Sequence, residues 1–320
     1  MIKKVCFAAI AAAALVSCNE KYADLPHVEE NAELVTFSVS VPGLETKSTG
    51  ESAAAEKTVN SLQVFVFNQH GVYETSAAAT KGEVSITCTA GQKRMVALVN
   101  AEEETGVPNY TALADRPVYL EDSDVNNLVM LGDTTVAVAA GKSINVEVSY
   151  LSSKVVLESV KLDLANPEHE ALDFKVTSVF LTNVVGDRKY INASTPSVWF
   201  HEGADLSKTL PFIYDSVSGG TLEPDGAEYG TDHYFYCYPN ATSTKTRLVI
   251  ETSIGEQTYY YPIEIEKLLP NNQYSYNVVL TRLGTDSPDG SLVEGACGVT
   301  VSVKGWTKNS STVIIYIRMS

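Results

Sequence analysis

The sequence predicts an all-β protein built from β-sandwiches, on three observations. Short runs of β-branched and aromatic residues recur along the 320 residues, and clusters of Gly, Pro, Asn and Asp separate them. Helical periodicity is confined to two short stretches. Many short strands with such turns are typical of sandwiches. Because a single core seldom grows beyond about 250–300 residues, we expect two domains, with the boundary near residues 151–153.

Each element follows from its local pattern, since apolar runs bounded by turn residues define strands. In chain order the predicted strands are residues 34–41, 62–67, 83–89, 94–100, 134–139, 143–150, 154–164, 175–183, 246–253, 257–266, 273–282 and 298–306. The final segment, residues 311–320 (STVIIYIRMS), predicts one more. Short helices are predicted at residues 110–114 and 123–130, the second with Asp122 or Ser123 as its N-cap.

The first residues predict export. Lys3 and Lys4 precede an apolar stretch, residues 5–16, which has the length of a signal-peptide core and is too short to span a bilayer. It ends in Leu-Val-Ser followed by Cys18, which resembles a bacterial lipobox. We therefore expect residues 1–17 to be a lipoprotein signal peptide and Cys18 to carry the lipid after cleavage. The alternative is an ordinary signal peptide with a chance cysteine.

Charge and cysteine content exclude several classes of partner and site. The net charge is −16 at pH 7, and loss of the two lysines in residues 1–17 moves it to about −18. Such a surface repels nucleic acid and anionic lipid. The folded part keeps Cys88, Cys237 and Cys297, far apart and without CxxC spacing. Neither a disulfide framework nor a thiolate metal site is predicted, and a single disulfide remains an alternative.

No motif predicts catalysis, a cofactor or a metal. The signatures HExxH, GxSxG, GxGxxG and GxxxxGK[ST] are absent from the sequence. One stretch approaches the EF-hand calcium loop, with Asp122, Asp124, Asn126 and Asp133 at positions 1, 3, 5 and 12, but Asn127 stands where that loop requires glycine. We predict a turn there, and a protein that is not an enzyme.

Several motifs, taken in order, carry a family resemblance. The lipobox is followed by a strand with a lone basic residue, by residues 60–67 (NSLQVFVF) with a turn at Gly71, and by residues 96–101 (VALVNA). Residues 269–276 (LPNNQYSY) and 299–306 (VTVSVKGW) follow in the second half. In this order the motifs resemble those of Bacteroidales fimbrillins, the FimA/Mfa-like structural subunits of type V pili.

The resemblance implies a fold and an assembly route. The fold is two tandem β-sandwich domains of transthyretin-like, Greek-key type, here residues 48–151 and 152–320, after a lipidated propeptide, residues 18–47. Fimbrillins reach the outer membrane as lipoproteins with palmitate on the cysteine. A trypsin-like protease then cuts after a basic residue, by position Lys47, and removes both the lipid and the first strand. A neighbour's C-terminal tail fills the groove, which gives a head-to-tail polymer of fimbrial subunits, an adhesive cell-surface fimbria.

The C-terminal tail has the apolar alternation that a donor strand needs. The donor candidates lie in the last strand and are Val313, Ile314, Ile315, Tyr316 and Ile317. The alternative donor is the preceding strand, with Val299, Val301 and Val303 on one face. Two further alternatives stay open: residues 34–41 are a permanent first strand of an anchor subunit that is not cut at Lys47, and the tail is the last strand of its own domain.

A surface lipoprotein that binds glycans is the alternative function. Trp199, Phe200 and the aromatic residues of 234–238 (YFYCY) would then stack against sugar rings. These side chains alternate along strands, which favours core packing. A hydrolase would need two convergent carboxylates, and no pattern singles out such a pair.

Overall fold

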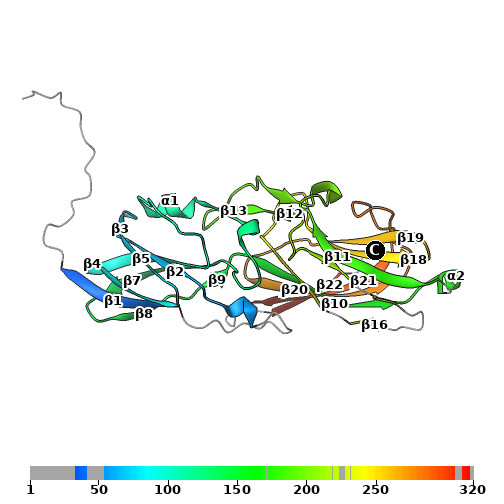
Figure 1. The fold of residues 1–320 in the computed structure, drawn as a ribbon, viewed down its shortest axis with the longest axis horizontal. Helices are drawn as coiled ribbons and strands as arrows, with labels where there is room; N and C mark the ends of the chain where they lie inside the picture. Colours follow the sequence, from blue (N-terminus) through cyan, green and yellow to red (C-terminus); the bar gives the residue numbers. More distant parts are fainter. Residues whose placement is uncertain are drawn as a thin grey trace, which may run out of the picture. The chain divides into compact units, whose positions relative to one another are not determined.

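β-Strands make up nearly all regular structure in the computed structural model, which confirms the all-β prediction (Figure 1). The structure describes residues 33–41, 54–170, 172–217, 219–222, 228–230, 232–306 and, for the main chain, 312–317. The predicted signal peptide, Cys18 and Lys47 lie outside these residues. No helix in the described ranges is long and apolar enough to cross a membrane.

Two sheets pack together in the amino-terminal half. The five-stranded sheet has the order β3-β2-β5-β7-β9, and the three-stranded sheet has the order β4-β1-β8. Their strands are β1 Leu34–Ser40, β2 Leu62–Phe67, β3 Tyr73–Ala79, β4 Glu83–Thr89, β5 Gly91–Val99, β7 Met130–Val138, β8 Ser143–Asn145 and β9 Ser149–Tyr150. Alternate residues of both sheets point inward and form one apolar core cluster, which extends to Tyr236 and Trp306.

Two larger sheets follow in the carboxy-terminal half. A six-stranded sheet has the order β16-β10-β20-β21-β22, with β17 also paired to β10, and a four-stranded sheet has the order β15-β11-β18-β19. Their strands are β10 Ser153–Leu162, β11 Phe174–Thr182, β15 Tyr214–Ser216, β16 Glu228–Tyr229, β17 His233–Cys237, β18 Arg247–Ile254, β19 Gln257–Glu264, β20 Asn272–Leu280, β21 Cys297–Gly305 and β22 Thr312–Ile317. A second apolar cluster lies between them and also includes residues of the amino-terminal half, among them Phe65 and Phe67.

Short elements connect the sheets. Strand β6, Pro117–Tyr119, pairs with β13, Asp187–Lys189, and β12, Val184–Val185, pairs with β14, Trp199–Phe200. The helical turns are η2 Ala55–Lys57, α1 Tyr110–Ala114, η3 Leu120–Asp122, α2 Pro167–Glu170 and η4 Glu202–Ala204. The β6–β13 pair joins residues from the two halves of the chain by main-chain hydrogen bonds.

One predicted helix is confirmed and the other is wrong. Helix α1 has the predicted bounds because Asn109 caps it, its Oδ1 accepting from Ala112 N at 2.8 Å. Residues 123–129 form no helix. The Asp124 side chain accepts from Asn126 N at 2.6 Å instead, and this Asx turn competes with helical pairing.

Candidate functional site

Strand β1 lies between two partners in the three-stranded sheet. It pairs antiparallel with β4 from Leu34 opposite Thr89 to Ser40 opposite Glu83. It pairs parallel with β8, where Ser38 lies opposite Ser143. Figure 1 shows β1 in blue beside β4 and β8. Loss of β1 would leave the facing edges of β4 and β8 without their hydrogen-bonding partner.

One face of β1 is buried in the core. Val35, Phe37, Val39 and Val41 are 3%, 2%, 0% and 7% exposed. They alternate with exposed or half-buried residues, as the pleat requires. At about 1.5–3 kcal/mol for each fully buried side chain, these four contribute about 6 kcal/mol or more to the stability of the sandwich. The pockets that they fill form an apolar row with a period of two residues.

The other face of β1 is polar. Thr36 Oγ1 and Thr87 Oγ1 lie 2.8 Å apart, Ser38 Oγ donates to Ser143 Oγ at 3.2 Å, and Ser40 Oγ donates to Asn145 Oδ1 at 2.7 Å. These bonds are exposed, so water can replace them at little cost. The energy that holds β1 therefore comes from its buried face and its main chain.

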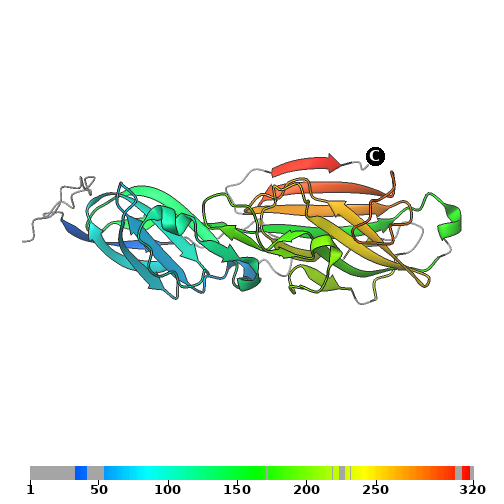
Figure 2. The ribbon, with the colours of Figure 1, turned by 90° about the horizontal axis from the view of Figure 1, so that it is seen from above.

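Strand β22 occupies the outer edge of the six-stranded sheet (Figure 2, red). It pairs antiparallel with β21 from Lys304 opposite Thr312 to Val299 opposite Ile317. The five donor candidates therefore lie in an edge strand with one paired neighbour among the described strands. An edge strand can leave a sheet without disturbing the pairing of the inner strands.

The alternative donor residues lie inside the same sheet. Val299 and Val301 are 5% and 3% exposed, and Val303 is half-buried. Strand β21 pairs with β20 along its whole length as well as with β22. Donation of β21 would break two ladders and expose the carboxy-terminal core.

The aromatic residues of the glycan-binding alternative are mostly internal. Phe200, Phe235, Tyr236 and Tyr238 are each 5% exposed or less. The half-buried Tyr234 donates its hydroxyl hydrogen to Asp232 Oδ2 at 2.7 Å. These four buried rings offer no flat surface to solvent, whereas Trp199 and Tyr234 are half-buried.

Asp133, the last residue of the calcium-like stretch, has protein partners. Asp133, in β7, receives the Arg94 guanidinium at 2.7 and 2.9 Å and the Tyr110 hydroxyl at 2.9 Å. Within the part of the chain that the structure describes, no three His, Cys, Asp or Glu side chains are grouped to hold a metal ion.

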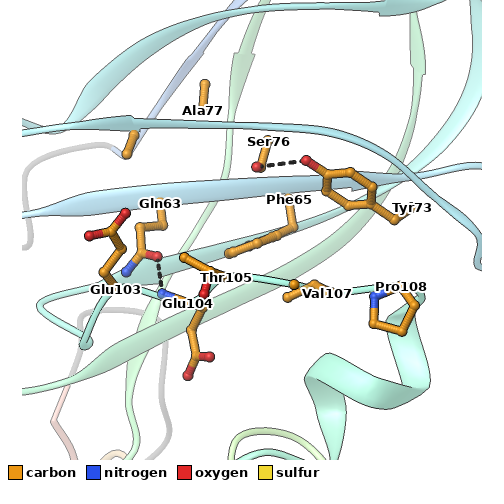
Figure 3. A pocket seen from close by; sticks show the side chains of 12 residues that line it. Gln63, Phe65, Tyr73, Ser76, Ala77, Glu103, Glu104, Thr105, Val107 and Pro108 are labelled. Carbon is orange, nitrogen blue, oxygen red and sulfur yellow. Dashed lines mark hydrogen bonds between the residues drawn. The ribbon is translucent and has the colours of Figure 1, made fainter.

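A cavity of about 620 Å³ lies between β2, β3 and residues 103–108 (Figure 3). Its polar groups bond to one another: Gln63 Oε1 accepts from Glu104 N at 2.8 Å, and the Tyr73 hydroxyl lies 2.9 Å from Ser76 Oγ. The Glu104 carboxylate accepts from Arg116. With these groups satisfied internally, we assign the cavity no ligand.

The three cysteines of the folded part are free and buried. Burial raises the pKa of Cys88 and Cys297 to about 11 and that of Cys237 to about 12. Each therefore remains a protonated, unreactive thiol at neutral pH.

Known proteins share the sequence pattern and the fold of this chain. A family model described as major fimbrial subunit protein (FimA) matches residues 35–185. Among solved structures, the fold resembles a fimbrilin (FimA) from Porphyromonas gingivalis at 16% identity and a TM-score of 0.66, over 85% of this chain and 98% of that one. It also resembles a candidate cell adhesion protein from Bacteroides eggerthii at 19% identity and a TM-score of 0.67, over 86% and 96% of the two chains.

A third similar structure is the tip fimbrial protein Mfa3 from Porphyromonas gingivalis with C-terminal truncation. Its identity is 14% and its TM-score 0.52, over 86% of this chain and all (100%) of that one. No curated protein matches the sequence. At these identities the structural likeness concerns the fold alone.

Proposed function

Because the chain belongs to the family of major fimbrial subunit proteins (FimA), we propose that it is a structural subunit of an adhesive cell-surface fimbria, assembled by strand exchange. The position of β1 carries the proposal. It is the central strand of its sheet, yet it precedes every other described element, and the chain between Val41 and Ala54 alone joins it to them. One cut in that segment therefore frees β1 from the rest of the covalent chain.

Removal of β1 creates the acceptor. The facing edges of β4 and β8 lose their partner, and the pockets of Val35, Phe37, Val39 and Val41 open to water. Exposed apolar pockets beside unpaired main-chain groups favour addition of a strand from another molecule. The incoming strand must place apolar residues at alternate positions.

The tail supplies that pattern. Val313, Ile315 and Ile317 repeat with the period of the buried β1 residues. In the uncut subunit β22 pairs with one strand, β21, at a sheet edge. After donation it would pair with two strands, β4 and β8 of the acceptor, and would bury its apolar face in the acceptor core. Donor and acceptor are different surfaces of one subunit, so the contact is heterologous and the polymer is head-to-tail and open.

Export and processing complete the proposal. Acylation of Cys18 would hold the precursor at the outer membrane, and a trypsin-like protease would cut after Lys47 to release the propeptide. The amino-terminal sandwich, the carboxy-terminal sandwich and the tail would then make up the mature subunit.

Capture of a tail peptide tests the proposal with the groove and the tail on separate molecules. A subunit that lacks residues 307–320 is cut with trypsin and then mixed with a labelled peptide of residues 307–320. We expect the cut subunit to bind the peptide stably and the uncut subunit to bind none. Equal binding by both forms, or binding of a scrambled peptide of the same composition, would contradict strand exchange.

A further inference from the structure

The carboxylate of Glu56 is buried in a set of donors from the second half of the chain. Glu56 lies in η2, ahead of β2, and is 1% exposed. Its Oε1 accepts from Lys154 Nζ at 2.5 Å and from the Tyr236 hydroxyl at 2.8 Å, and its Oε2 accepts from Trp306 Nε1 at 3.0 Å. We call Lys154, Tyr236, Trp306 and Tyr150 the Glu56 socket.

The socket also holds the main chain of η2. The Tyr150 hydroxyl donates to the Glu56 carbonyl oxygen at 2.9 Å. The Trp306 ring stacks on the rings of Tyr150 and Tyr236, with centroids 4.1 and 5.7 Å apart. On the following side, Asn100 Nδ2 donates to the carbonyl oxygen of Thr58 at 2.7 Å. Residues 56–58 are therefore held by side chains before and after Lys57.

Lys57 itself is exposed, and only two basic residues, Lys47 and Lys57, stand between β1 and β2. A trypsin-like protease can recognise both side chains. Cleavage after Lys57 needs an extended main chain, whereas here Lys57 N and Thr58 N donate within a 3-10 turn, to the carbonyl oxygens of Ala54 and Ala55. The protease must wait for this turn to open, so its rate follows the population of the open form.

We propose that the Glu56 socket protects the Lys57–Thr58 bond from the processing protease and so confines the cut to the chain before η2. The proposal rests on the processing step of the proposed function, and it adds the feature that determines where the protease cuts the chain. Opening η2 withdraws Glu56 from Lys154, whose side chain is 0% exposed, and leaves a buried cation without its carboxylate. Breaking a buried pair from one side is strongly unfavourable, which keeps the open form rare.

Changes in the socket test this without altering the protease's recognition sequence. Lys154→Met removes the charge from the far side of the socket and keeps residues 50–62 unchanged, whereas a change of Glu56 would alter the residue beside the scissile bond. Tyr236→Phe removes one donor with less disturbance of packing. Lys93→Met is the matched control, because Lys93 forms a comparable 2.5 Å ion pair with Glu74, 5% exposed on the lysine side, that does not contact η2.

The full-length chain and each variant are digested under native conditions with a lysine-specific protease, and the new amino termini are followed by mass spectrometry. In the unaltered protein and in Lys93→Met we expect Ser48 termini to form readily and Thr58 termini to form only at the slow rate set by rare opening of η2. In Lys154→Met we expect Thr58 termini on the order of 100-fold faster than in the unaltered protein, and in Tyr236→Phe a smaller increase.

Two results would overturn the proposal. The first is that the native unaltered protein forms Thr58 termini as fast as Ser48 termini. The second is that native Tyr236→Phe and Lys154→Met form no Thr58 termini, although the same chains are cut after Lys57 when unfolded. If Lys154→Met does not fold, the rate of Thr58 termini is measured in Tyr236→Phe and Trp306→Phe instead. A protein that resists cleavage at Lys47 as well contradicts the assembly route. Protection of Lys57 is still measured in that case, by comparing folded with unfolded protein.

Discussion

The buried residues of β1 determine how firmly the precursor keeps its own strand. Phe37 is 2% exposed and is among the largest fully enclosed side chains. We predict that Phe37→Ala lowers the free energy of unfolding of the uncut precursor by about 3–5 kcal/mol, because it leaves a cavity in the core. Urea denaturation of the precursor measures this directly.

Ser38→Ala is the control, since Ser38 lies on the polar face and its loss should cost less than about 0.5 kcal/mol. The assembly route adds a second expectation. After proteolysis β1 is gone, so polymers from Phe37→Ala should be as stable as those from the unaltered chain. Weaker polymers would mean that β1 stays in the assembled subunit.

The buried cysteines make the stability of the folded protein depend on pH, and their burial determines the sign of this dependence. Folding raises the thiol pKa to about 11 for Cys88 and Cys297 and about 12 for Cys237, from 9.0 in the unfolded chain. The folded state therefore binds more protons above pH 9, and stability is lost as the pH rises from there through the folded pKa values. For the fully buried Cys237 the loss is about 1.4 kcal/mol per pH unit.

Urea midpoints at pH 8 and pH 10 test this, and Cys237→Ala should show a shallower fall than the unaltered protein. Equal slopes for the two proteins would show that Cys237 ionises in the folded state.

The Glu56 socket could not be predicted from the sequence. Glu56 follows three alanines and precedes a lysine, a pattern typical of an exposed turn. Its side-chain partners lie 98, 180 and 250 residues later in the sequence. Local pattern carries no information about contacts at that separation.

At the scale of elements, strands rich in β-branched and aromatic residues are predictable. Strands β2 and β4 have the predicted bounds, and β10, β11, β18, β19, β20 and β21 differ from prediction by at most two residues at each end. These strands are buried on at least one face, so burial and intrinsic preference agree.

Two strands show where local pattern fails. Strand β3 (YETSAAA) has few β-formers, and it becomes a strand because β2 pairs with it along the edge of the sheet. The predicted strand at residues 143–150 is interrupted. Its first part, β8, pairs with β1 and its last part, β9, pairs with β7, so the chain passes from one sheet to the other between them.

The donor strand should have one inward face. Positions 34 and 36 of β1 are exposed, and positions 35, 37, 39 and 41 are buried. A tail in the same groove buries alternate residues only, and Val313, Ile315 and Ile317 form the apolar set with the β1 spacing. We predict that Ile315→Asp weakens capture of the 307–320 peptide by at least about 100-fold, because a carboxylate then enters the core.

Ile314→Asp is the matched change on the other face and should weaken capture by less than about threefold, as expected for an exposed position. Peptide titration with a fluorescent label measures both. The opposite order, with Ile314→Asp the more damaging, would place the Ile314 and Tyr316 face inward.

At the scale of the whole molecule, the proposed strand exchange would make a polymer that is open at both ends. The exposed groove of one terminal subunit and the free tail of the other remain available, so growth continues without closure. We predict that deletion of residues 312–320 yields processed monomers at every concentration, because the acceptor is intact and the donor is missing. Light scattering of cut protein gives the size.

That deletion mutant should still be recruited as a terminal subunit when mixed with unaltered cut protein, and it should shorten the polymers in proportion to its amount. Polymers of the deletion mutant alone would require a donor other than β22, with β21 as the next candidate.

Trypsin digestion of the purified precursor, with amino-terminal sequencing of the core and sizing of the product, tests strand exchange. We expect a new terminus at Ser48 together with a ladder of oligomers that is absent before digestion. A precursor that keeps residues 34–41 after prolonged digestion, and stays monomeric, would contradict it.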